Sequence, residues 1–216
     1  TRAIERGVRV EVLVDSAPVG GMTGRAAAAL DNLARAGATV RVVGGERAWY
    51  RYHHAKYAVV DDRALVTTEN WKPAGTGGAS SRGWGVITGQ EPVVTGLVET
   101  FRADTDRRNT RPWEEFDPKL TTENRSTGDY PQRFDPESVP VNQTHLLVAP
   151  DNARAAILDQ IRSAEESIDV LQVSIGDRSF AFLQAVLDAA ERGVEVRILL
   201  SGAWYVEEQN RQLVAW

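Results

Sequence analysis

The sequence contains no cysteine, a single methionine and few lysines, since only three of its 25 basic residues are not arginine. The absence of cysteine excludes disulfide bonds and thiolate metal sites, and it leaves the redox compartment undecided. The arginine bias is typical of a GC-rich genome or of a salt-adapted organism. The formal net charge of −5 fits the second of these and argues against a dedicated nucleic-acid coat protein, which is usually basic.

Long apolar runs are also absent, because no stretch approaches the roughly 18 consecutive apolar residues that a membrane-spanning helix needs. The first residues, TRAIERG, have neither signal-peptide character nor an initiator methionine. We therefore expect the chain to be a piece of a longer protein. The localisation of that parent stays unknown, and an exported or membrane-associated parent remains open.

The first part of the chain, residues 1–104, alternates short apolar strands with helices. The strands are rich in β-branched residues, and the helices have apolar residues at helical spacing. Strands are predicted over 8–15, 38–44, 55–62, 63–68 and 82–88, and helices over 24–37 and 92–104. The runs on either side of residues 61–63 indicate a hairpin.

The composition changes at about residue 105, where a polar, proline-punctuated stretch without periodicity begins. We expect residues 105–143 to be a connector. Residues 144–216 then predict strands over 144–150, 167–175 and 194–202, with helices over 152–166 and 179–193. This βαβαβ order is typical of parallel strands covered by helices. The predicted class is α/β, with a mixed, largely parallel sheet flanked by helices.

One local pattern occurs twice. ERGVRVEVLV at 5–14 and ERGVEVRILL at 191–200 both indicate a helix end, a glycine cap and a strand. The simpler interpretation is two unrelated helix-to-strand turns with a common sequence. The alternative is that the chain runs just over one period of a duplicated protein, so that its two parts hold one repeat in permuted order.

The stretch YHHAKYAVVDD at 52–62 holds two of the three histidines and one of the three lysines. Side chains two residues apart share a face of a strand, so His54 and Lys56 should project together while His53 faces the other way. An ammonium group suits an anionic phosphate, and it lowers the pKa of a neighbouring imidazole. A neutral His54 can then act as a nucleophile or a proton carrier near pH 7.

The next predicted strand ends in Thr67-Thr68-Glu69-Asn70. Across an antiparallel hairpin, Thr68 and Asn70 are expected beside His54 and Lys56, where a hydroxyl and a carboxamide could donate to phosphoryl oxygens. Asp61 is expected at the turn, at the edge of the site. By residue types alone, the alternative is a half-exposed edge strand with incidental polar side chains.

These residues resemble the signature of the phospholipase D superfamily, H-x-K-x4-D followed by G-S-x-N. His54, Lys56 and Asp61 match the first part with its spacing, and Asn70 matches the end of the second. SRGWGVI and the helix ending in FRAD are similar to the elements that follow the motif. Residues 145–202 resemble the opening half of a superfamily repeat, so the resemblance covers most of the chain outside 105–143.

The resemblance implies an αβα sandwich and a two-step cleavage or transfer of phosphodiesters that needs no metal or cofactor. His54 would form a phosphohistidine or protonate the leaving alcohol, while Lys56 and Asn70 would hold the non-bridging oxygens. Thr68 would replace the family's serine, and Asp61 would support the motif.

The sequence departs from the pattern at three points. Thr67-Thr68 replaces Gly-Ser, and the spacer after Asp61 is one residue shorter. Many members also have an acidic residue that bonds the catalytic histidine, and the aligned stretch Ser81-Arg82-Gly83 has none. Either another group orients His54, or this copy of the motif is weakened.

Superfamily enzymes use two signatures, and this chain has one. The resemblance therefore implies a second copy of the motif, from a segment outside the chain or from a homodimer. The substrate is a phosphodiester, either nucleic acid or phospholipid. The alternative function is a weakly active or inactive domain that serves as a binding module.

Overall fold

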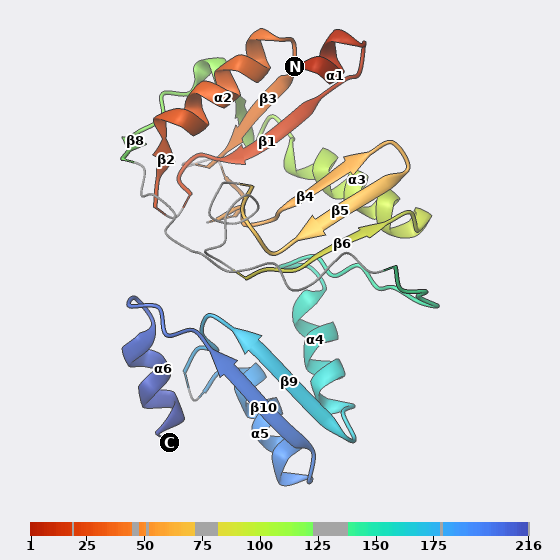
Figure 1. Cartoon of the computed structure of the whole chain (residues 1–216), viewed down its shortest axis with the longest axis vertical. Helices are drawn as coiled ribbons and strands as arrows, with labels where there is room; N and C mark the ends of the chain where they lie inside the picture. Colours follow the sequence, from red (N-terminus) through yellow and green to blue (C-terminus); the bar gives the residue numbers. More distant parts are fainter. Residues whose placement is uncertain are drawn as a thin grey trace. The chain divides into compact units, whose positions relative to one another are not determined.

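The computed structural model describes residues 1–18, 20–44, 48–50, 52–71, 82–122, 138–177 and 179–215. The chain forms two compact units, Thr1–Thr144 and His145–Trp216 (Figure 1). Within the described ranges, no helix is both long enough and apolar enough to cross a membrane. Part of the expected connector, residues 123–137, lies outside the described residues.

The first unit combines helices with three hydrogen-bonded sheets. Its helices are α1 (Arg2–Glu5), α2 (Gly24–Arg35), the 3-10 helix η2 (Trp113–Glu115) and α3 (Glu91–Asp104). Its strands are β1 (Glu11–Asp15), β2 (Met22–Thr23), β3 (Thr39–Val43), β4 (Tyr57–Val60), β5 (Arg63–Thr67), β6 (Gly85–Thr88), β7 (Thr110–Pro112) and β8 (Leu120–Thr121). The strand orders are β1-β3-β7, β4-β5-β6 and β2-β8.

The central strand β3 carries the apolar core of this unit. It pairs in parallel with β1 and antiparallel with β7, and its Val42 is fully buried. Helix α2 contributes Ala27 to the same cluster and is capped by Thr23, whose Oγ1 accepts the Ala26 N–H at 3.2 Å. Such a cap satisfies one of the free N–H groups of a helix start.

The antiparallel sheet β4-β5-β6 packs against α3. Tyr57 of β4 lies opposite Val66 of β5, and the two strands turn at Asp61. Ala64 of β5 is fully buried. The predicted hairpin is therefore present, and it forms the framework next to the candidate site.

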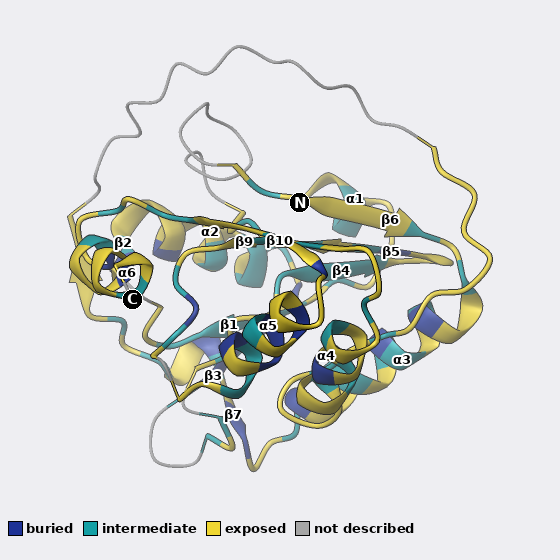
Figure 2. Ribbon diagram, turned by 90° about the horizontal axis from the view of Figure 1, so that it is seen from below, coloured by how far each residue is buried: buried dark blue, intermediate teal, exposed yellow. Residues whose placement is uncertain are grey.

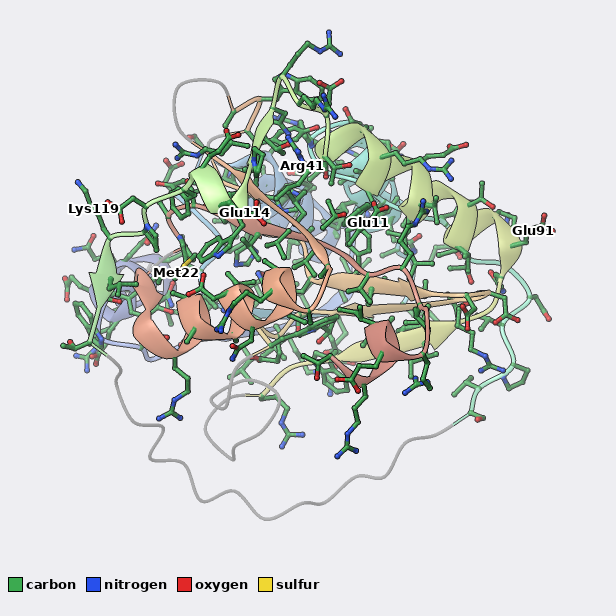
Figure 3. All side chains as sticks on the ribbon, turned by 90° about the horizontal axis from the view of Figure 1, so that it is seen from above. Glu11, Met22, Arg41, Glu91, Glu114 and Lys119 are labelled. Atoms are coloured by element: carbon green, nitrogen blue, oxygen red, sulfur yellow. The ribbon has the colours of Figure 1, made fainter. Side chains whose placement is uncertain are left out.

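Residues 110–121 add β7, η2 and β8 to the first unit, although no periodicity marked them in the sequence. Arg41 of β3, which is labelled in Figure 3, donates from Nε to Thr110 Oγ1 at 2.6 Å and from Nη2 to Thr110 O at 3.1 Å. Trp113 is 5% exposed in the core cluster, and its Nε1 donates to Asp31 Oδ1 at 2.7 Å. Strands β7 and β8 are three and two residues long, which is too short for an alternating pattern to be recognised in the sequence.

The second unit contains α4 (Ala153–Arg162), β9 (Ser167–Gln172), α5 (Ala181–Glu191), β10 (Glu195–Leu200) and α6 (Glu207–Val214). Strands β9 and β10 pair in parallel, with α5 as the crossover between them. Helix α5 buries the face that carries Leu183 and Val186 (Figure 2). Helix α6, which was not predicted, is fixed by Asn210, whose Nδ2 donates to Val173 O and Ser201 O at 2.9 and 2.8 Å.

The strand predicted over 144–150 is absent from the described structure. The segment instead forms a turn before α4, in which the Val148 N–H donates to Asn152 Oδ1 at 2.7 Å and the Asn152 N–H donates back to Val148 O at 3.0 Å. A side chain that bonds nearby backbone competes with strand pairing, which explains the difference.

The two ERGV stretches adopt the same helix-ending turn. Gly7 and Gly193 have φ of 86° and 93°. In the first copy, Gly7 N–H donates to Ile4 O and Val8 N–H to Ala3 O; in the second, Gly193 N–H donates to Ala190 O and Val194 N–H to Ala189 O. This is the bond pattern of a Schellman cap, which needs a left-handed residue such as glycine. The shared turn follows from the ERGV sequence whether or not the copies have a common origin.

The class predicted from the sequence is confirmed, since the structure is a mixed α/β fold with several parallel strand pairs. The described strands form four separate hydrogen-bonded groups.

We expect Trp113→Ala to lower the free energy of unfolding of the first unit by about 3–5 kcal/mol, because it leaves a cavity in the core. Trp113→Phe should cost less, since the ring is largely kept and one hydrogen bond is lost. Denaturant titration followed by circular dichroism measures both. Trp84→Ala is the matched control, as Trp84 is 66% exposed. Equal effects of the Trp113 and Trp84 alanine variants would contradict the placement of Trp113 in the core.

Candidate functional site

The segment that carries the predicted site leads directly into β4. His54, Ala55 and Lys56 precede the first residue of the strand, Tyr57. The pairing with β5 continues one step further, because the Thr67 N–H donates to Lys56 O at 2.9 Å. The expected extended conformation therefore holds at Lys56, next to the end of β5.

His54 and Lys56 lie close together in the segment that precedes β4. Lys56 Nζ donates to the backbone oxygen of His54 at 2.6 Å. The pKa of His54 is lowered from its ordinary value by partial burial and then by the Lys56 charge, while the Asp15 carboxylate opposes this shift. The pKa of Lys56 is lowered by burial and raised by Glu69. The Lys56 ammonium group therefore lies near the exposed His54 side chain, and both partial burial and this charge favour the neutral imidazole.

Asp15, the last residue of β1, ties this segment to the first sheet. Its Oδ2 accepts the backbone N–H of His53 at 2.7 Å, and its Oδ1 accepts that of Ala17 at 2.7 Å. The carboxylate therefore fixes the backbone immediately before His54. A charged acceptor makes such hydrogen bonds short and strong.

His53 points into the interior, opposite to the exposed His54. Its Nε2 lies 3.0 Å from Asp104 Oδ2, and the two side chains are only 11% and 9% exposed. Asp104 is the last residue of α3, and its backbone oxygen accepts from Asn109 Nδ2 at 2.8 Å. Burial, followed by the Asp104 charge, raises the pKa of Tyr57. This buried pair joins α3 to the site segment.

Thr68 and Asn70, the other predicted phosphate-binding residues, follow the end of β5. Thr68 Oγ1 accepts the Trp84 N–H at 2.9 Å, so its hydroxyl is engaged with the strand on the far side of β5. Asn70 is exposed beyond the strand end. Glu69 is the residue whose charge acts on Lys56.

Asp61 lies at the other end of β4, in the hairpin turn, with φ of 53°. At roughly 3.3 Å per residue, it is about 17 Å along the chain from Lys56. The structure therefore brings together His54 and Lys56 of the five predicted residues, and it separates Asp61 from them. A left-handed conformation is tolerated by aspartate, which is consistent with Asp61 shaping the turn.

Three carboxylates near this segment were missed by reasoning from the sequence: Asp15, Glu69 and Asp104. A usable signal existed for Asp15, because it ends a parallel strand, where functional side chains of α/β folds gather. Glu69 and Asp104 carried no such signal, since their positions depend on strand register and on helix packing. Among the described residues, no group of three or more histidine, aspartate or glutamate side chains is placed to hold a metal ion.

Comparison with protein-family models gives a match to the family described as cardiolipin synthase, PLD-like domain, over residues 1–105 and 157–214. These segments cover more than half of the chain and include the site segment. No curated protein and no solved structure matches the chain. The chain therefore belongs to the cardiolipin synthase PLD-like domain family, within the phospholipase D superfamily of phosphodiesterases.

Proposed function

We propose that the protein is a metal-independent phosphodiesterase in which His54 is the nucleophile or the proton donor and Lys56 binds the phosphate. The observation that carries this proposal is the Lys56 ammonium group, which bonds to the His54 backbone oxygen and lies near enough to the accessible imidazole to lower its pKa. The family match supports the phosphodiesterase class, and the substrate, a nucleic acid or a phospholipid, is left to the assay below.

The reaction runs in two displacements. A ring nitrogen of neutral His54 attacks phosphorus, the bond to the leaving alkoxide breaks, and an acid gives that oxygen a proton. Water or an alcohol then attacks the phosphohistidine, gives its proton to the conjugate base of that acid, and releases neutral His54 as the bond between nitrogen and phosphorus breaks. The Lys56 ammonium offsets the charge of the non-bridging oxygens throughout. Thr68 and Asn70 are proposed to assist phosphate binding, and Asp61 to support the hairpin that carries the motif.

A second signature supplies the acid of the first step, either from a segment outside this chain or from a second copy of it. If a second copy supplies it, specific activity should rise with protein concentration, because only the dimer holds two His54–Lys56 sets. Sedimentation velocity and rate measurements over the same concentrations test this. A strict monomer with concentration-independent specific activity would contradict the dimer.

We expect His54→Ala to reduce hydrolysis of bis(p-nitrophenyl) phosphate, DNA or phosphatidylcholine by roughly a thousandfold, because the attacking group is lost. The assay is run in EDTA, and the substrate that turns over identifies the class. His145→Ala is the matched control, since His145 is exposed in the second unit. Activity that survives His54→Ala, or that EDTA abolishes, would overturn the mechanism. Substrate binding without turnover would favour the binding-module alternative.

The pH dependence of kcat/KM should follow the protonation of His54. Its pKa lies below the ordinary value, so the neutral form persists to more acidic pH, and kcat/KM should fall only as the pH drops through this lowered pKa. Lys56→Met removes a charge that lowers the His54 pKa, and the acidic limb should therefore move to higher pH. Lys119→Met is the matched control, because Lys119 is exposed beside β8 (Figure 3). An acidic limb that is unmoved in Lys56→Met would refute this assignment.

A further inference from the structure

The carboxylate of Asp15 is the acidic group that the structure places against the site segment from a neighbouring strand. Both of its oxygens accept backbone N–H groups, Oδ2 from His53 and Oδ1 from Ala17, each at 2.7 Å. The first of these bonds fixes the peptide that immediately precedes His54. The sequence has no acidic residue at Ser81-Arg82-Gly83, the stretch aligned with the family's histidine partner.

Among the described residues, the charged groups named here lie on the His54 segment itself and on three other elements. Lys56 lies on the same segment and lowers the pKa of His54, and Asp15 on β1 raises it. Glu69, beyond the end of β5, acts on Lys56. Asp104 on α3 bonds the buried side chain of His53 and also acts on Tyr57. Of these carboxylates, Asp15 is the one that both accepts a hydrogen bond from the backbone beside His54 and raises the pKa of the His54 ring.

We propose that Asp15 is the positioning residue of His54. It holds the His53–His54 backbone against the end of β1, and its negative charge stabilises the imidazolium that forms when His54 holds a proton. Asp104 has a different task, because it secures the His53 ring in the interior and touches no reacting group. This inference rests on the proposed function, since it assigns Asp15 a role in the protonation of His54.

The decisive measurement is the titration of His54 by NMR with carbon-labelled histidine, which needs no turnover. We expect His54 in Asp15→Asn to titrate at lower pH than in the wild-type protein, because a charge that favours the imidazolium is removed. The acidic limb of kcat/KM should move in the same direction, and kcat should fall on the order of tenfold through lost positioning. An unchanged His54 titration in a folded Asp15→Asn variant would overturn the proposal.

Two further variants separate positioning from general stability. Asp62→Asn makes the same charge change at an exposed position in the hairpin turn and should leave the His54 titration unmoved. Asp104→Asn should lower the free energy of unfolding with a smaller effect on the His54 titration than Asp15→Asn. A larger effect of Asp104→Asn on that titration would contradict the proposed division of roles.

The wild-type protein provides a test without substitution, which holds even if Asp15→Asn does not fold. The His53 amide proton should change its chemical shift as the Asp15 carboxylate is protonated, because the two are hydrogen bonded. A His53 amide shift that stays flat through the acid range would overturn the contact. A wild-type chain that hydrolyses none of the three substrates would instead refute the proposed function, and the titration would still decide the role of Asp15.

Discussion

The hydrogen bond from the His53 N–H to Asp15 is the contact on which the arrangement of the site depends. It joins the carboxyl end of β1 to the segment that enters β4, two elements from different hydrogen-bonded sheets. The pair formed by His53 and Asp104 joins the same segment to α3. Asp15 holds the backbone of this segment and Asp104 holds the His53 ring in the interior, so the His54 side chain faces outward.

The reactivity expected of His54 results from influences that shift its pKa in opposite directions. Partial burial and Lys56 favour the neutral imidazole, and Asp15 favours the charged one. A histidine that exchanges protons during a reaction needs both influences, because a strongly biased pKa would trap one form. The pKa of Lys56 is in turn lowered by burial and raised by the charge of Glu69. Because these groups together set the pKa of His54, a substitution that removes one of their charges is expected to move the pH profile.

The elements predicted with success are those whose pattern is local and long. Helices α2, α3 and α5 and strands β1, β3, β9 and β10 all have clear periodicity, and the structure has them within a few residues of the predicted bounds. Strands β7 and β8 are too short for a pattern, and they form because Arg41 and the core around Trp113 hold them. The strand expected over 144–150 does not form, and the Val148 N–H instead donates to the side chain of Asn152.

The sequence by itself determined which residues are proposed as the reactive pair, because alternation along an extended chain predicts that His54 and Lys56 share a face and that His53 faces the other way. It also determined the glycine-capped turns at Gly7 and Gly193, which depend on local backbone geometry. Only the tertiary structure decided which carboxylates surround the pair. Asp15, Glu69 and Asp104 are between 13 and 51 residues from the histidine or lysine they act on, and strand register and helix packing bring them there.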